Sequence, residues 1–163
     1  MNELAPWAGF LGSLASASAT LTGFLFVAIS INLSHVISTP GLTARAFESV
    51  MMVAGILIIA ILGLVPGQIP EYFGIQVVAV ALLLIVFSLP VQCGALRRQH
   101  YRSIWHVVVR ILLCQGALVP LAAGGVLLAM GNSLGLYWLV PGIVCAIFWS
   151  VLSAWVLLVE IVR

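Results

Sequence analysis

The sequence has no lysine and no aspartate, and its only charged residues are six arginines and four glutamates among 163 residues. A soluble domain carries about a quarter charged residues, whereas this chain carries 6%. So little polar surface excludes a water-soluble globular enzyme. A net charge of +2 also excludes a non-specific nucleic-acid binder, which needs a strongly basic surface. Disordered segments have the opposite composition, so the sequence predicts an integral membrane protein.

Long apolar runs take the place of charge, since 64% of the residues are hydrophobic. A helix that crosses about 30 Å of hydrocarbon needs roughly 20 mostly apolar residues. Five windows have this length, and the predicted spans are residues 11–33, 46–65, 72–95, 107–130 and 136–159. The runs are continuous, whereas the strands of a membrane barrel alternate. The predicted fold is therefore an all-α polytopic membrane bundle of five helices that forms a single domain, residues 1–163.

The arginines predict the orientation of the chain, because arginine in short loops collects on the cytoplasmic side of the membrane. With five spans, Arg45, the group from Arg97 to Arg110, and Arg163 all fall on one side. We therefore expect the N-terminus outside and the C-terminus inside, in the cell inner membrane. The charge pattern does not test the first span, which carries many hydroxyl groups. The residues before it lack the basic start of a secretory signal, so an uncleaved helix is expected.

Small residues spaced four apart, which favour close packing of membrane helices, occur in two spans. They are Ala15, Ala19 and Gly23 in the first span and Gly142, Ala146, Ser150 and Ala154 in the last. We expect both ridges to be buried against other helices, either within the protomer or between protomers. Five short helices enclose little volume, so a pore or large cavity would be shared between copies. A homo-oligomer or a subunit of a larger membrane complex is expected.

Polar side chains inside the spans are the first candidates for function, because they are costly in lipid. The candidates are Ser16, Thr20, Asn32, Gln76, Gln92 and Gln115. They would line a pore or another polar path through the membrane. The alternative is that the amides only bond neighbouring helices together.

Pro120 lies near the middle of the fourth predicted span. Proline removes a backbone hydrogen bond and clashes with the preceding turn, so a kink is expected there. It is either a hinge used in function or an ordinary kink, which neighbouring helices tolerate.

A basic patch lies between the third and fourth spans and runs into the fourth. Its members are Arg97, Arg98, Arg102, His106 and Arg110. The patch would attract anions or anionic lipid head groups; alternatively, it only reflects the inside preference of arginine and the reach of long side chains to the interface. Glu48, near the inner end of the second span, is a candidate ion-pair partner for Arg110 or Arg45.

Metal, cofactor and catalytic motifs are missing from the sequence. His35, His100 and His106 have no metal-site spacing, so no metal and no haem are expected. The three cysteines show no Cys-x-x-Cys spacing and lie in apolar runs, as buried free thiols do. No Ser-His-Asp set and no phosphate-binding glycine motif can be assembled, so an enzyme is not expected.

Three segments resemble a group of small, uncharacterised bacterial membrane proteins. They are residues 20–33 (TLTGFLFVAISINL), residues 40–46 (PGLTARA) and residues 64–68 (LVPGQ). Some members of such groups are described as modulators of a membrane-bound AAA protease. The resemblance covers about the first 70 residues and implies a bacterial inner-membrane protein without catalytic residues.

The function expected from the sequence is a homo-oligomeric, non-enzymatic channel or pore-like protein for anions or small neutral solutes. The alternative is an accessory or regulatory subunit that packs against a larger membrane complex. The expected partners are therefore the lipid bilayer, including anionic lipids, and either further copies of the chain or that complex.

Overall fold

The computed structural model describes residues 4–31, 33–38, 41–98 and 104–159, and within these ranges it leaves out the side chains of residues 35, 95–98, 104–110, 113 and 156–159. The described residues form helices and no strands. The elements are η1 (Ala5–Trp7), α1 (Ala8–Ile31), α2 (Leu33–Ser38), α3 (Leu42–Gly63), α4 (Pro70–Arg98), α5 (Ile104–Ala129) and α6 (Leu134–Val159).

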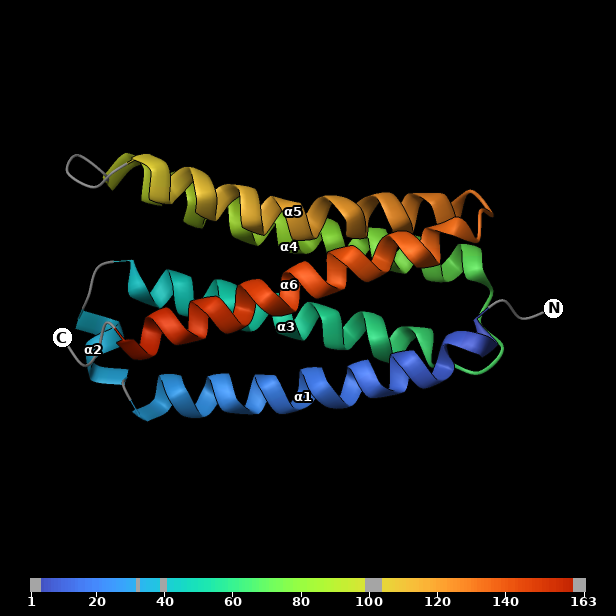
Figure 1. Cartoon of the computed structure of the whole chain (residues 1–163), viewed down its shortest axis with the longest axis horizontal. Helices are drawn as coiled ribbons and strands as arrows, with labels where there is room; N and C mark the ends of the chain where they lie inside the picture. The colour runs from blue at the N-terminus through green and yellow to red at the C-terminus, as the bar shows by residue number, and fades with distance from the viewer. Residues whose placement is uncertain (1–3, 32, 39–40, 99–103, 160–163) are drawn as a thin grey trace.

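The long helices α1, α3, α4, α5 and α6 lie side by side along the long axis of the molecule (Figure 1). Helix α3 packs against α1, α4 and α6, and α5 packs against α4 and α6. We call the end where α3 begins and α4 ends the Arg45 end, and the end where α1 and α6 begin the Trp7 end. Helices α1 and α6 both run from the Trp7 end to the Arg45 end (Figure 1).

Among the residues that the structure describes, four helical segments are long and apolar enough to cross a membrane: Ala5–Ile31, Leu42–Gly63, Pro70–Gly94 and Leu134–Trp155. Within α5 the described apolar segment is the shorter Cys114–Ala129. The prediction of a membrane-embedded helical bundle is thus confirmed. The ends of the long helices differ from the predicted span ends by at most four residues, as at 42 against 46.

Glycines with positive φ mark three of the connections between helices. Gly41 (φ 87°) precedes α3, Gly67 (φ 74°) lies between α3 and α4, and Gly131 (φ 77°) follows α5. After α5, the amides of Gly131 and Asn132 donate to the carbonyls of Leu128 and Leu127, both at 2.9 Å, which is the Schellman pattern that ends a helix. The Asn132 side chain then accepts a hydrogen bond from the Leu134 amide at 3.0 Å. This tight turn holds α5 and α6 antiparallel.

The connection between α1 and α3 contains the short helix α2, where the sequence predicted only a loop. The Thr43 hydroxyl donates to the carbonyl of Val36 at 2.8 Å. Val36, Leu42 and Ala46 form a small buried cluster. Together these contacts hold α2 against the first turn of α3.

Glycines bring α4, α5 and α6 into backbone contact near the Trp7 end. A Cβ atom added at Gly74 would lie 2.4 Å from the Ala129 nitrogen and 2.7 Å from the Gly125 oxygen. A Cβ atom added at Gly135 would lie 2.5 Å from the Gly124 oxygen. Real Cβ atoms do not approach other atoms this closely, so these positions require glycine. This is the small-residue packing expected of membrane helices.

Helix α3 is central and α1 is peripheral in the bundle. Within an 18-residue window of each helix, 61% of the window is buried in α3, compared with 17% in α1. Apolar side chains fill the interior from the middle of the bundle to the Trp7 end, and Ile59, Phe73, Leu118, Leu121 and Leu128 are fully buried. In this half, the described interior therefore contains no polar path.

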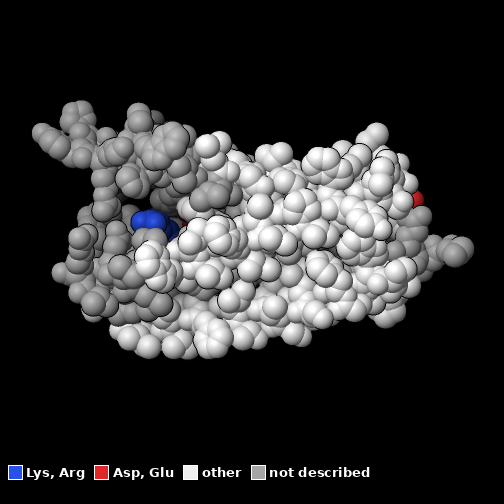
Figure 2. All heavy atoms as spheres, in the orientation of Figure 1, with Lys and Arg blue, Asp and Glu red and all other residues white. Residues whose placement is uncertain are grey.

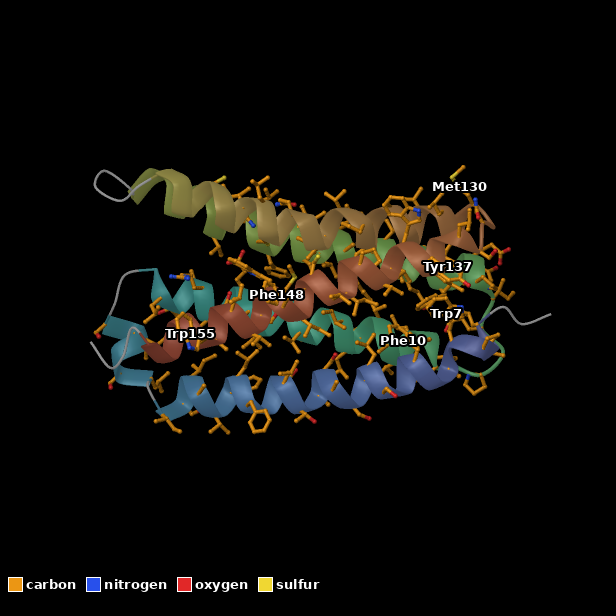
Figure 3. The ribbon with its side chains drawn as sticks, viewed as in Figure 1. Trp7, Phe10, Met130, Tyr137, Phe148 and Trp155 are labelled. Atoms are coloured by element: carbon orange, nitrogen blue, oxygen red, sulfur yellow. The ribbon has the colours of Figure 1, made fainter. Side chains whose placement is uncertain are left out.

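Three aromatic rings join the start of the chain to α6 at the Trp7 end (Figure 3). Trp7 packs edge-on against Phe10 at 5.8 Å and against Tyr137 at 5.1 Å between ring centroids. We expect Trp7→Ala to lower the free energy of unfolding by about 2 kcal/mol, since each such pair contributes about 1 kcal/mol. Unfolding in mixed micelles measures this. Trp138→Ala, which removes a side chain that is 52% exposed, is the control and should change stability little; equal losses would contradict the expectation.

Candidate functional site

A buried polar cluster lies between α3, α4 and α5 in the half of the bundle nearer the Arg45 end. It consists of Glu48 from α3, Gln92 from α4, and Cys114 and Gln115 from α5. Glu48 is the seventh residue of α3, about 9 Å along the helix from its start. The sequence placed Glu48 close to the end of its span as a partner of arginine, whereas the structure places it in the protein interior, 6% exposed.

Hydrogen bonds connect the members of this cluster across the three helices. The Gln115 side chain donates from Nε2 to Gln92 Oε1 at 3.3 Å, and Gln92 donates from Nε2 to Glu48 Oε1 at 3.4 Å. The Cys114 thiol donates to the same Glu48 oxygen at 3.6 Å. One carboxylate oxygen thus accepts donors from two neighbouring helices. Gln92 and Gln115, which the sequence placed on separate spans, are direct neighbours.

Burial gives these hydrogen bonds their importance. Gln92 is 3% exposed and Cys114 is fully buried. A polar group in such surroundings is costly when it has no partner, and an ionisable residue inside a membrane protein is a functional-site hypothesis. The cluster is therefore the strongest candidate site within the bundle. It can tie three helices together through one carboxylate.

Charged groups are rare on the described surface. Figure 2 shows almost none over the helices on this face, and a basic group is visible at the end where α3 begins. Arg45 is half-buried. The side chains of Arg97, Arg98, His106 and Arg110, and the whole of Arg102, lie outside the described residues, so the basic patch and a Glu48–Arg110 ion pair stay predictions.

The other polar candidates from the sequence do not join this cluster. Gln76 accepts a hydrogen bond from Gln68 near the Trp7 end. Ser16 and Thr20 are exposed on α1, and their hydroxyls donate to the carbonyls one turn earlier at 3.1 and 2.9 Å. Asn32 lies outside the described residues. The described candidates thus occupy three separate places and do not form one path within the protomer.

Two further predictions concern helix shape and reactive groups. Pro120 is half-buried inside α5, which the structure assigns as one helix; its role as a hinge stays a prediction. No group of three or more His, Cys, Asp or Glu that could hold a metal ion occurs among the described residues. Cys114 is buried as expected, but Cys93 and Cys145 are exposed on the bundle surface.

The small-residue ridge of the last span is in the interior. In α6, Ala146 is fully buried and Ser150 is 1% exposed. A Cβ atom added at Gly142 would meet the Leu121 nitrogen at 2.9 Å, and Ala154 packs against the Leu25–Val53 cluster. These residues hold α6 against α5 and the cluster between α1 and α3.

The prediction for the first span is wrong within the protomer. Ala15 reaches the core, but Ala19 and Gly23 are exposed, and nothing lies within 4 Å of a Cβ atom placed on Gly23. Helix α1 instead buries Leu11, Leu14, Ser18 and Leu25. Its leucine side chains pack toward α3, as Leu11 does against Gly63.

Sequence reasoning missed Cys114 as a polar partner, and it missed Gly74, Gly124, Gly125 and Gly135 as packing residues. No pattern along a single helix pairs Cys114 with Glu48, or Gly74 with Gly125 and Ala129. No protein-family model matches the chain, and neither curated proteins nor solved structures give a match.

Proposed function

We propose that this chain is a non-enzymatic inner-membrane protein that crosses the bilayer five times, with its N-terminus outside and its C-terminus inside. In this proposal several copies assemble through α1 and form a narrow polar path for small neutral solutes or anions. The observation that supports it best is the outward face of α1. The exposed residues Gly9, Ser13, Ser16, Thr20 and Gly23 make up this face, which we call the α1 outer face.

The α1 outer face combines small residues with hydroxyl groups. Small residues allow close approach of a second helix in a membrane, where apolar area alone does not drive association. The hydroxyls of Ser13, Ser16 and Thr20 donate to the carbonyls of Gly9, Gly12 and Ser16. Their oxygen atoms remain available as acceptors on this face. Uncharged acceptors suit neutral solutes, and the arginines at the inner end favour anions over cations.

A path between copies is favoured over a path through one protomer. The interior toward the Trp7 end is filled by fully buried apolar side chains such as Phe73 and Leu128. The buried cluster around Glu48 therefore ends against apolar packing. Among the described side chains, the outside of α1 offers polar atoms in the middle of a span without such a barrier.

Disulfide cross-linking tests the assembly. Ser16→Cys and Gly23→Cys are introduced after replacement of the exposed Cys93 and Cys145 by alanine. We expect rapid oxidative dimer formation in membranes, because the α1 outer faces would meet. Leu83→Cys on α4, which is 57% exposed, is the matched control and should not cross-link. Equal cross-linking at both places would indicate random collisions and contradict the proposal.

Flux through liposomes tests the path itself. Protein reconstituted into vesicles should pass glycerol or chloride, and Ser16→Leu combined with Thr20→Leu should abolish this flux. Gln115→Ala, within the buried cluster, should leave it unchanged. A monomer that transports nothing and co-purifies with a much larger membrane complex would overturn the proposal in favour of an accessory subunit, which would use the same α1 face.

A further inference from the structure

A separate groove lies between α1, α3 and α6 on the side of α1 next to its outer face. It has a volume of about 140 Å³, and its walls include Leu25 and Ala28 of α1, Val53 of α3, and Ser150 and Ala154 of α6. Helices α1 and α6 both contact α3 but touch each other much less. The groove is the space left between these two helices.

The groove offers no polar group to a ligand. Its only lining residue with a polar side chain is Ser150, and that hydroxyl donates to the Ala146 carbonyl of its own helix at 2.8 Å. Cavities of this size and character stay dry and take apolar molecules. An occupant of the groove is therefore a hydrocarbon group.

The position of the groove indicates what lies beside its open side. All wall residues belong to helical segments long and apolar enough to cross a membrane, so the open side of the groove faces lipid. Most of the walls lie in the halves of α1 and α6 nearer the Arg45 end. Arg45 is about two helical turns, about 12 Å along the axis of α3, from Val53, so the groove and this arginine lie in the same half of the bundle.

We infer that the groove binds one acyl chain of a phospholipid, from the membrane leaflet at the Arg45 end. An acyl chain in the groove supplies the van der Waals contacts that the wall residues would otherwise lack. The α1 outer face lies beside the groove but includes none of its wall residues, so the assembly proposed above does not require the groove to be covered. The inference depends on embedding in the membrane and is independent of transport.

Photolabelling tests the inference. The intact protein is placed in nanodiscs that contain a phospholipid with a diazirine in the middle of one acyl chain, and labelled residues are located by mass spectrometry. We expect labelling concentrated on Phe24 and Val151, which line the groove, relative to Leu82 and Leu83 on the exposed side of α4. Even labelling of all exposed apolar side chains would overturn the inference.

Filling the groove provides the second arm of the test. Ala154→Leu should lower labelling at Phe24 about tenfold, which corresponds to about 1.4 kcal/mol of lost chain affinity. Val151→Phe fills the groove from a side chain that is 46% exposed and gives the same test if Ala154→Leu does not fold. Ala79→Leu, on the exposed side of α4, is the matched control. Unchanged labelling in a folded groove variant, or a second copy cross-linked at Phe24 in place of lipid, contradicts the inference.

Discussion

Gly74→Ala is expected to lower the free energy of unfolding by about 3 kcal/mol. The new Cβ atom would lie 2.4 Å from the Ala129 nitrogen and 2.7 Å from the Gly125 oxygen. Both are backbone atoms of α5, so no rotation of a side chain can relieve the clash. Relief requires α4 and α5 to separate, which also disturbs the α5–α6 contact at Gly124 and Gly135. Reversible unfolding in mixed micelles measures the loss.

Gly94→Ala is the matched control for this prediction. It makes the same chemical change in the same helix, but nothing lies within 4 Å of its added Cβ atom. We expect stability within about 0.5 kcal/mol of the parent protein, as for surface changes in general. Similar losses for both variants would show that close backbone packing at Gly74 is not the cause, because alanine in place of glycine otherwise favours a helix.

Glu48→Ala is the second change with a large expected effect, a loss of about 2–3 kcal/mol. The substitution takes the acceptor from the Gln92 amide and the Cys114 thiol, and a buried group without its partner costs about 1–3 kcal/mol. It also leaves a small cavity, which adds to the loss. The same unfolding experiment measures the effect. In addition, Cys114 should become reactive toward a small thiol reagent as the cluster loosens.

Glu48→Gln tests whether the stability comes from the oxygen of Glu48 as a hydrogen-bond acceptor or from its charge. It keeps the size of the side chain and a carbonyl oxygen, so we expect most of the stability to return if acceptance of the two donors is the main contribution. Glu71→Gln, at an exposed carboxylate, is the control for a lost charge and should be neutral. If Glu48→Ala is as stable as the parent protein, the cluster does not hold the three helices together.

The positions of the helices could be predicted from the sequence, because apolar runs of sufficient length end at clear turn residues. Pro40 and Gly41 separate α1 from α3, and Gly131 and Asn132 separate α5 from α6. The short helix α2 could not be predicted, since its six residues depend on contacts with the start of α3. Local sequence therefore determined the spans better than the connections.

The faces of the helices were much harder to predict than their ends. In lipid, an apolar side chain is equally suited to the interior and to the outside, so hydrophobicity does not identify the buried face of α1. Its small residues predicted an interior ridge, yet Leu11, Leu14 and Leu25 are buried instead. The cluster around Glu48 likewise depends on which residues of α4 and α5 lie opposite it. Spacing along one helix contains no such information.

The glycine contacts at the Trp7 end also bear on how the bundle can move. There α4, α5 and α6 touch through main-chain atoms, so these helices cannot move closer together. Toward the opposite end, α3, α4 and α5 are joined by side-chain hydrogen bonds of Glu48, Gln92, Cys114 and Gln115. A separation of the helices would therefore cost packing contacts at one end and hydrogen bonds of a buried carboxylate at the other.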